Sequence, residues 1–480
     1  MTMRQAAKRS RRLAILAFIV PLLLLVRLKP DTTLTAAQSA AVMPYADARP
    51  VFLAVRDDLW PAPLRGMTEA ARQAAWPAWA AKRDAEVRDR VDAGEADSVI
   101  HLLLFGTSFT RAPRATDREL TLLAMRPAEA IAVLRPRIDD FTAAVLNPAT
   151  NERLEVARRV MRRAGVEPTA ANRPKVQQYL EQRAAALGRD GAAQLQAMLH
   201  DPTGNDTIYR QRGLSSDTTF AIDFGVERAL EELRARKVFA PGSISRVAIV
   251  GPGLDFIDKQ NGYDFYPQQT IQPFAVIDSL LRLGLAPSAG IRVTAFDVAP
   301  RVIEHINAAR AAAATGKGYT LVLPRSRDRG WTPPLLTFYQ RLGQRIGEAQ
   351  PPERTPKPPS TAGRVDVRSV VVRPAIAQAV SARDLNIVLE QANSAAVGGP
   401  FDLVVATNIL LYYDVFEQSL ALANIAHMVR PGGVLLSNNR LVELPSSPMT
   451  GIGYTDTIYS STPGEGDAGD RVYSYQRPLR

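Results

Sequence analysis

The chain of 480 residues contains no cysteine and only four histidines. Without cysteine there are no disulfides, thiolate metal sites, iron–sulfur clusters or cysteine nucleophiles. His101, His200, His305 and His427 show no ligand spacing, so we expect no metal site. The lack of cysteine does not fix the compartment, because both a reducing cytosol and a cysteine-free secreted protein are consistent with it.

The sequence also lacks a basic stripe of the kind that binds nucleic acid. The net charge is +11, but seven of these charges are cations within residues 1–30, which contain no acid. Basic residues elsewhere alternate with acids on predicted helical faces, which is typical of solvated surface. A hydrophobic fraction of 46% and a charged fraction of 22% exclude a disordered, collagen-like or wholly transmembrane chain. We therefore expect a globular protein of two or three domains with no nucleic-acid partner.

Long apolar runs are absent except for one of 14 residues near the N-terminus. The basic stretch KRSRR (8–12) precedes LAILAFIVPLLLLV (13–26), a pattern typical of a signal peptide or signal anchor. The run is shorter than the roughly 20 residues of a full span and contains Pro21. We assign residues 1–45 to a signal or membrane-anchor segment. We favour an uncleaved anchor, and the alternative is a secreted or periplasmic protein after cleavage. The positive-inside rule sends the rest of the chain outward.

The remaining chain divides by composition near residue 240. Residues 46–240 are rich in Ala, Arg, Glu and Leu and are predicted to be mainly helical, with a short strand at 99–105. Residues 241–480 alternate apolar β-branched runs with helical patterns. Strands are expected at 246–250, 292–296, 319–323, 401–407 and 433–438, and helices near 272–284, 300–313 and 414–428. This alternation predicts βαβ units and a parallel sheet covered on both faces.

Two further segments depart from that alternation. The strands expected at 452–460 and 471–477 bracket a Gly-rich stretch and predict a terminal hairpin. The Pro-rich stretch 351–363 predicts an exposed insertion.

A glycine turn follows the first predicted strand. Gly251 and Gly253 let the backbone turn tightly and approach a ligand at the carboxyl edge of the sheet. The third glycine of a dinucleotide fingerprint is missing, and Asp255 lies in the loop. An acid there repels a pyrophosphate but suits an amino group or a hydroxyl. The loop therefore argues against NAD and for a ligand without phosphates.

Two polar residues follow other predicted strands at the same edge. Asp297 ends the strand at 292–296 and can accept both hydroxyls of a ribose, or can equally cap the helix near 300–313. Asn408 lies just past the strand at 401–407, where a ligand crevice is expected. Both alternatives for Asp297 stay open at this point.

The segments RVAIVGPG, VTAFDVAP, FDLVVATNILLYY and RPGGVLLSNN occur in this order. With them, residues 241–480 resemble a class I S-adenosylmethionine-dependent methyltransferase, and ARDLNIVLEQ (382–391) is similar to the chemotaxis-receptor (CheR-type) subgroup. The resemblance implies a Rossmann-like α/β fold with a seven-stranded, mostly parallel sheet and an antiparallel C-terminal hairpin. It also implies a glycine loop on the amino-acid part of the cofactor, an acid on the ribose, and adenine near residues 384–385. The implied cofactor-binding residues are Gly251, Gly253, Asp255, Asp297, Val298, Asp384, Leu385 and Asn408.

The sequence therefore predicts a methyltransferase that uses S-adenosylmethionine on an unidentified acceptor, either a protein carboxylate or a small molecule. The long loop 255–270 is interpreted as a lid or part of the acceptor site. No strong general base stands out, and methyl transfer often needs none, so no catalytic residue is assigned. An exported domain would lack this cytosolic cofactor. The alternative is therefore a non-catalytic, membrane-associated binding or scaffold protein with a methyltransferase-like fold.

Overall fold

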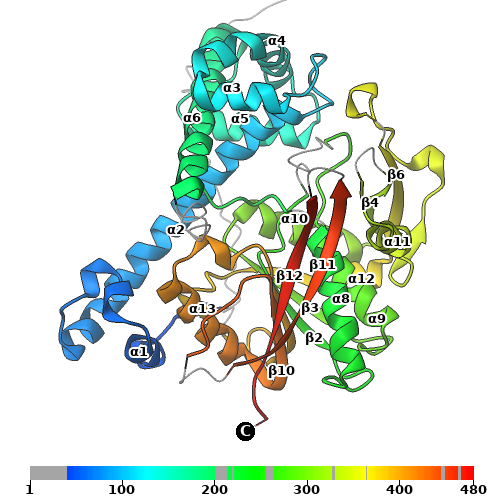
Figure 1. Ribbon diagram of the computed structural model, residues 1–480. Helices are drawn as coiled ribbons and strands as arrows, with labels where there is room; N and C mark the ends of the chain where they lie inside the picture. Colours follow the sequence, from blue (N-terminus) through cyan, green and yellow to red (C-terminus); the bar gives the residue numbers. More distant parts are fainter. Residues whose placement is uncertain are drawn as a thin grey trace, which may run out of the picture. The chain divides into compact units, whose positions relative to one another are not determined.

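The computed structural model describes residues 40–200, 213–218, 221–255, 264–326, 330–363, 365–444, 449–462 and 466–479 (Figure 1). These residues all belong to one compact unit. The predicted signal or anchor segment 1–45 lies almost entirely outside the described residues. Within the described ranges, no helix combines the length and the apolar character needed to cross a membrane.

The central element is a seven-stranded sheet with the order β11-β12-β10-β9-β2-β3-β7. Only β12 runs against its neighbours, since it pairs antiparallel with both β10 and β11 while the other pairs are parallel. The sheet has seven strands and an antiparallel final hairpin, but the strand at Val380–Asp384 was not among those expected and takes the place of the expected strand at 319–323. The strands are β2 (Arg246–Val250), β3 (Arg292–Asp297), β7 (Val380–Asp384), β9 (Phe401–Ala406), β10 (Val429–Ser437), β11 (Thr450–Thr462) and β12 (Gly466–Gln476).

Helices cover this sheet because its inner strands are apolar on both faces. Every residue of β9 is buried, as are the last four residues of β2. Helix α8 packs against α9 and the β11–β12 hairpin, α10 packs against β3 and β7, and α13 packs against β10 (Figure 1). These helices are α8 (Ala221–Ala235), α9 (Gln272–Arg282), α10 (Pro300–Ala314) and α13 (Val415–Met428). A reciprocal capping box between Asp414 and Glu417 begins α13.

The region before residue 240 is helical as predicted, with one exception. It holds α1 (Tyr45–Ala54), α2 (Glu69–Phe105), α3 (Asp117–Met125), α4 (Pro127–Leu146), α5 (Glu152–Arg163) and α6 (Arg173–His200). The strand predicted at 99–105 is wrong, because these residues form the last two turns of α2. A helix end surrounded by other helices is apolar on several sides, and its sequence is then indistinguishable from a buried strand.

The helices divide between two hydrophobic cores. Phe52 and Trp76, from α1 and the first half of α2, belong to the same core as the sheet. Val99 and Phe141, from the end of α2 and from α4, belong to a second, all-helical core. The single 37-residue helix α2 therefore links the two cores, and its middle turns lie beside the sheet's carboxyl edge.

The chain between β3 and β7 carries an insertion that corrects one strand assignment. Residues 319–323 were expected in the parallel sheet. They lie instead in β4 (Tyr319–Ser326), in a separate antiparallel sheet with the order β4-β6-β5. Leu321 and Leu323 are fully buried, so their apolar pattern alone did not reveal which sheet they join. The other elements here are α11 (Pro333–Arg341), β5 (Gly347–Ala349), β6 (Asp366–Val372) and α12 (Pro374–Gln378), and β1 (Ala40–Val42) pairs with β8 (Glu390–Ala392) elsewhere. The Pro-rich insertion 351–363 connects β5 to β6.

Candidate functional site

A cavity of about 190 Å³ lies at the carboxyl ends of β2, β3 and β9. This edge is where open α/β sheets bind their ligands. Three parts of the chain line it: the strand ends, the turn after β9, and a wall from α2 and segment 213–218. The lining residues are Val91, Leu214, Ser215, Ser216, Asp217, Thr218, Gly251, Gly253, Asp297, Val298, Ala299, Asn408, Ile409, Leu411 and Tyr412. Five of the eight residues predicted from the sequence are among them.

The glycine turn is held tightly between its neighbours. Gly251 and Gly253 have φ angles of 66° and 62°, in the left-handed region that favours glycine. A Cβ at Gly251 would lie 3.1 Å from Ile409 Cδ1, and one at Gly253 would lie 2.9 Å from Thr218 Cβ. Both glycines are therefore needed for backbone geometry and for close approach.

Segment 213–218 forms a wall that the sequence did not reveal. The main chain of Leu254 donates to Ser216 O at 2.7 Å, and Thr218 donates back to Leu254 O at 2.9 Å. Leu214 N also donates to Arg90 O of α2 at 2.7 Å. The sequence of this segment, GLSSDT, contains no motif that would have indicated a binding site. It lines the cavity because its main chain pairs with the glycine turn.

Asp297 lines the cavity from the end of β3. Its Oδ1 accepts a hydrogen bond from Ala299 N at 2.8 Å. Burial raises its pKa to about 6, against the opposing effect of main-chain N–H groups at Ala299, Val298 and Gly253. The N-cap of α10 is Ala299, with no side-chain cap, so Asp297 does not fill the alternative helix-capping role.

Asn408 lines the opposite side of the cavity, after β9. Its φ is 59°, a left-handed conformation that asparagine tolerates better than most residues. Its N–H donates to Asn438 Oδ1 at 2.8 Å, and Asn438 Nδ2 donates back to Asn408 Oδ1 at 2.6 Å. This reciprocal pair joins the carboxyl ends of β9 and β10.

The other three predicted residues lie outside the cavity lining. Asp255 is buried, and one of its carboxylate oxygens accepts from Tyr266 Oη and Gln269 Nε2, each at 2.8 Å. Asp384 stands beside Asp297 in the β3–β7 register, but its carboxylate accepts from Arg88 Nη1 and Nη2 at 2.9 and 3.0 Å. Leu385 is buried and donates its N–H to Asp297 O at 3.2 Å. Their implied roles toward a cofactor stay predictions.

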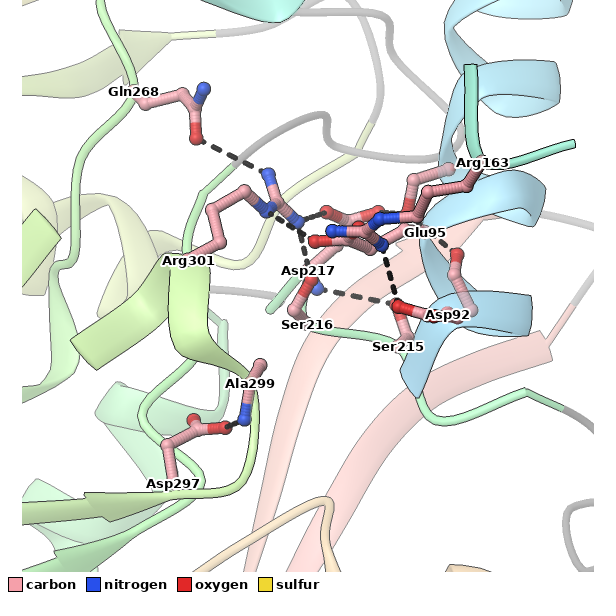
Figure 2. A network of polar contacts seen from close by, with 12 residues as sticks. Asp92, Glu95, Arg163, Ser215, Ser216, Asp217, Gln268, Asp297, Ala299 and Arg301 are labelled. Carbon is pink, nitrogen blue, oxygen red and sulfur yellow. Dashed lines mark hydrogen bonds and ion pairs between the residues drawn. The ribbon is translucent and has the colours of Figure 1, made fainter. Parts of the chain in front are cut away.

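A buried polar network behind the cavity is centred on Arg301, at the start of α10 (Figure 2). Its Nε lies 3.4 Å from Glu95 Oε1 of α2, and its Nη2 lies 3.4 Å from Asp217 Oδ1. Arg301 also donates to Ser216 Oγ and, at 3.2 Å, to Gln268 Oε1. The side chains of Arg301, Glu95 and Asp217 are 6%, 3% and 1% exposed. The network therefore holds the 213–218 wall between α2 and α10.

Further contacts join the helices to the chain that follows the glycine turn. Residues 256–263 of the predicted loop 255–270 lie outside the described residues, but 264–270 are in contact with the helical region. Asp264 accepts from Thr107 N at 2.9 Å and from Thr107 Oγ1 at 2.7 Å. Arg153 donates to Tyr266 O, and Gln268 N donates to Glu152 of α5. The helical region thus contacts the site through both the 213–218 wall and this segment.

Comparison with protein-family models and with curated proteins finds no match. Among solved structures, the chain is similar to the N-methyltransferase NodS of Bradyrhizobium japonicum WM9, at 16% identity over 53% of this chain and 97% of that one, with a TM-score of 0.25. It is also similar to the magnesium protoporphyrin IX methyltransferase ChlM of Synechocystis PCC 6803 with bound SAM, at 10% identity over 60% and 97% and a TM-score of 0.23. TM-scores of this size establish no common fold, so the site has to be interpreted from its own geometry.

Proposed function

We propose that the protein is a methyltransferase that binds S-adenosylmethionine in the cavity at the ends of β2, β3 and β9. The observation that carries the proposal is the combination of a left-handed glycine turn, Asp297 and Asn408 around one cavity. A seven-stranded sheet with one antiparallel strand stands behind it, as the sequence resemblance implies.

The charge of the lining supports a ligand without phosphates. Of the fifteen lining residues, two are aspartates and none is lysine or arginine. Phosphate groups in proteins are usually met by cations or by free N–H groups of a helix N-terminus. The N-terminus of α10 reaches the lining at Ala299, but the N–H of Ala299 is already donated to the Asp297 carboxylate. Asp217 is already paired with Arg301, so Asp297 is the lining carboxylate that can stabilise a ligand with a sulfonium and an α-ammonium group. This argues for S-adenosylmethionine over a dinucleotide.

The residues have distinct roles in this proposal. The main chain at Gly251 and Gly253 and the polar wall 215–218 hold the amino-acid end of the cofactor. Asp297 accepts hydrogen bonds from the ribose hydroxyls, and Val298 contributes apolar contact beside it. The bound cofactor supplies an activated methyl group. The protein contributes by orienting it and by excluding water, and this needs no covalent residue.

The membrane attachment of residues 1–45 and the likeness to the chemotaxis-receptor subgroup remain proposals from the sequence. Both concern where the enzyme acts and on what, and neither alters the cofactor site described above. An acceptor bound beside Asn408 and Tyr412, at the β9 side of the cavity, would approach the methyl group from the side opposite Asp297.

The test compares two aspartates at the same height on neighbouring strands. Asp297→Asn should weaken S-adenosylhomocysteine binding by about 13-fold to 160-fold, because one charge-assisted hydrogen bond is worth about 1.5–3 kcal/mol. Asp384→Asn should leave affinity within about threefold, because Arg88 and not the cofactor takes up its carboxylate in this proposal, and a loss as large as that of Asp297→Asn would instead support the cofactor role that the resemblance implies. Equal affinity in the wild type and both variants would remove Asp297 from the site, and no binding by the wild type would favour the scaffold alternative.

A further inference from the structure

The cavity described above has two ends that differ in their side chains. The end beside β3 holds Asp297 and the hydroxyl groups of the wall 215–218, and Arg301 of α10 pairs with this wall at Asp217 (Figure 2). The end beside β9 is lined by apolar and aromatic side chains together with Asn408. These side chains, called the apolar end below, belong to Val91, Leu214, Ile409, Leu411 and Tyr412.

Contacts with α2 show that the apolar end is one continuous surface. The main-chain oxygen of Arg90 accepts from Leu214 N at 2.7 Å, and the Arg90 guanidinium donates to Tyr412 O at 3.2 and 3.3 Å. Val91 is the next residue of the same helix. Ser98, which donates to the wall at the end beside β3, lies eight residues further along α2, a distance of about 12 Å. The two ends of the cavity are therefore separated along one helix.

The order of the strands assigns the two ends to different ligands. Strand β2 lies between β9 on one side and β3, followed by β7, on the other. In the proposed function the cofactor lies on the glycine turn after β2 and extends to Asp297 on β3, away from β9. Neighbouring strands are about 4.8 Å apart, so the apolar end lies one strand beyond the glycine turn. It is therefore the part of the cavity that the cofactor leaves for the methyl acceptor.

No charged side chain lines the apolar end among the described residues. Both aspartates of the lining belong to the other end, where Asp217 is paired with Arg301. Arg90 lies behind the apolar end, but its guanidinium is directed to Tyr412 O and does not line the cavity. A carboxylate or an ammonium group would lose its hydration here without gaining a partner of opposite charge, which is costly. The apolar end therefore favours an uncharged ligand.

Asn408 narrows the chemistry of this ligand further. Its main-chain N–H donates to Asn438 Oδ1, and its own Oδ1 accepts from Asn438 Nδ2, which fixes how both amide groups are turned. The polar atom that Asn408 has left for a ligand is Nδ2, a hydrogen-bond donor. A donor suits an oxygen with a free lone pair and does not suit an ammonium group, which has none.

We propose that the methyl acceptor is an uncharged small molecule, with an apolar body in the apolar end and an oxygen atom on Asn408 Nδ2. This inference rests on the methyltransferase function proposed above and names its substrate class. Sites for small molecules are typically apolar with a few polar groups that fix orientation, and the apolar end with Asn408 has this composition. The inference argues against the carboxyl methylation that the chemotaxis-receptor likeness suggests.

Transfer to such an acceptor balances without a charged group of the protein. A lone pair of the neutral nucleophilic atom forms a bond to the methyl carbon while the carbon–sulfur bond breaks. The electron pair of that bond stays on sulfur, so the sulfonium becomes a neutral thioether. The positive charge passes to the methylated acceptor, which releases a proton to solvent when it leaves.

The test compares three probes that share one ring system and differ in charge. At pH 7.5, 2-naphthol is uncharged, 2-naphthoate is anionic and 2-naphthylmethylamine is cationic. Each probe is titrated by calorimetry into the full chain saturated with S-adenosylhomocysteine. We expect 2-naphthol to bind at least about 10-fold more tightly than either charged probe, because the apolar end offers no partner for a charge.

The possible outcomes separate this inference from the proposed function. Tighter binding of the anionic or the cationic probe would overturn the inference. No binding of 2-naphthol, although S-adenosylhomocysteine binds, would overturn it as well. Absence of S-adenosylhomocysteine binding would instead overturn the proposed function.

Two variants should exchange the preferred charge, a result that loss of structure cannot produce. Leu411→Lys places a cation in the apolar end and should raise affinity for 2-naphthoate about 10-fold or more. The matched control is Leu281→Lys on α9, because Leu281 is also half-buried but lies outside the cavity lining. Asn408→Asp keeps an oxygen for Asn438 and replaces Nδ2 by a second oxygen, so it should favour the cationic probe over 2-naphthol. If neither variant changes the order of the three affinities, the acceptor does not bind at the apolar end.

Discussion

Replacing Arg301 should uncouple the cavity wall from both the helical region and the sheet. Arg301 pairs with both Glu95 and Asp217, whereas Arg163 reaches Glu95 from another side of the network (Figure 2). Arg301→Met keeps much of the side-chain volume but removes the charge and every hydrogen bond. Glu95 would keep Arg163 at 2.7 Å, and Asp217 would keep the hydroxyl of Ser98.

The magnitude follows from the burial of these groups. Removing one partner of a buried ion pair costs about 3–5 kcal/mol, because the remaining charge stays desolvated. Since both acids keep one partner, we expect the lower end, about 3 kcal/mol. Arg88 offers a matched control, because it also pairs with two acids, Asp84 and Asp384, but its side chain is 34% exposed. Arg88→Met should cost about 0.2–1 kcal/mol.

The assay is urea unfolding of the full chain followed by circular dichroism, with S-adenosylhomocysteine titration on the same samples. Arg301→Met should also weaken binding at least 10-fold, because the wall that lines the cavity loses its anchor. A double-mutant cycle with Asp217→Asn should recover part of the stability loss, because Asp217 then keeps only the neutral hydroxyl of Ser98 and its charge is left uncompensated. If Arg301→Met is no more destabilising than Arg88→Met, the network does not support the site as argued.

Two other predictions concern the cavity itself. Gly253→Ala should lower both stability and cofactor affinity in thermal unfolding and titration, because Gly253 has a φ of 62° and the new Cβ would lie 2.9 Å from Thr218 Cβ. The control is Gly284→Ala, since Gly284 has a similar φ of 66° but no atom within 4 Å of the new Cβ. Gly284→Ala should therefore show only the backbone cost of about 1 kcal/mol, with unchanged affinity. Affinity for S-adenosylhomocysteine should fall as pH drops below about 6, because the folded protein then protonates Asp297, whose raised pKa is about 6, and the ribose loses its acceptor. It should level off above pH 7, and a profile unchanged by Asp297→Asn would assign the effect to another group.

A strand of the sheet could be predicted from the sequence where a short apolar run is followed directly by a residue suited to ligand binding. In that case one local pattern gives both the strand and the end of it that faces the cavity. The runs at 246–250 and 292–296 are apolar on both faces and end in Gly251 and Asp297, so both the strands and the cavity position could be derived. The run at 319–323 has the same composition, yet it pairs with 366–372, which only long-range register decides. Apolar pattern predicts burial but does not name the partner strand.

The wall of the site was not predictable for a different reason. Segment 213–218 has no periodicity, and its place depends on Arg90, Leu254 and Arg301, which are distant in the sequence. For Asp384, the sequence predicted the position in the sheet but not the partner of its carboxylate. Its position beside Asp297 is as expected, but Arg88 of α2 takes up its carboxylate, and the helical region carried no motif that foretold this contact.

The central claim is that this cavity holds a nucleoside cofactor without phosphates, and calorimetry on the full chain tests it most directly. S-adenosylhomocysteine and NAD should be titrated under the same conditions at pH 7.5. We predict one site per chain for S-adenosylhomocysteine with a Kd tighter than about 100 μM, roughly −5.5 kcal/mol, and no heat of binding for NAD. No binding of S-adenosylhomocysteine, or tighter binding of NAD, would contradict the account.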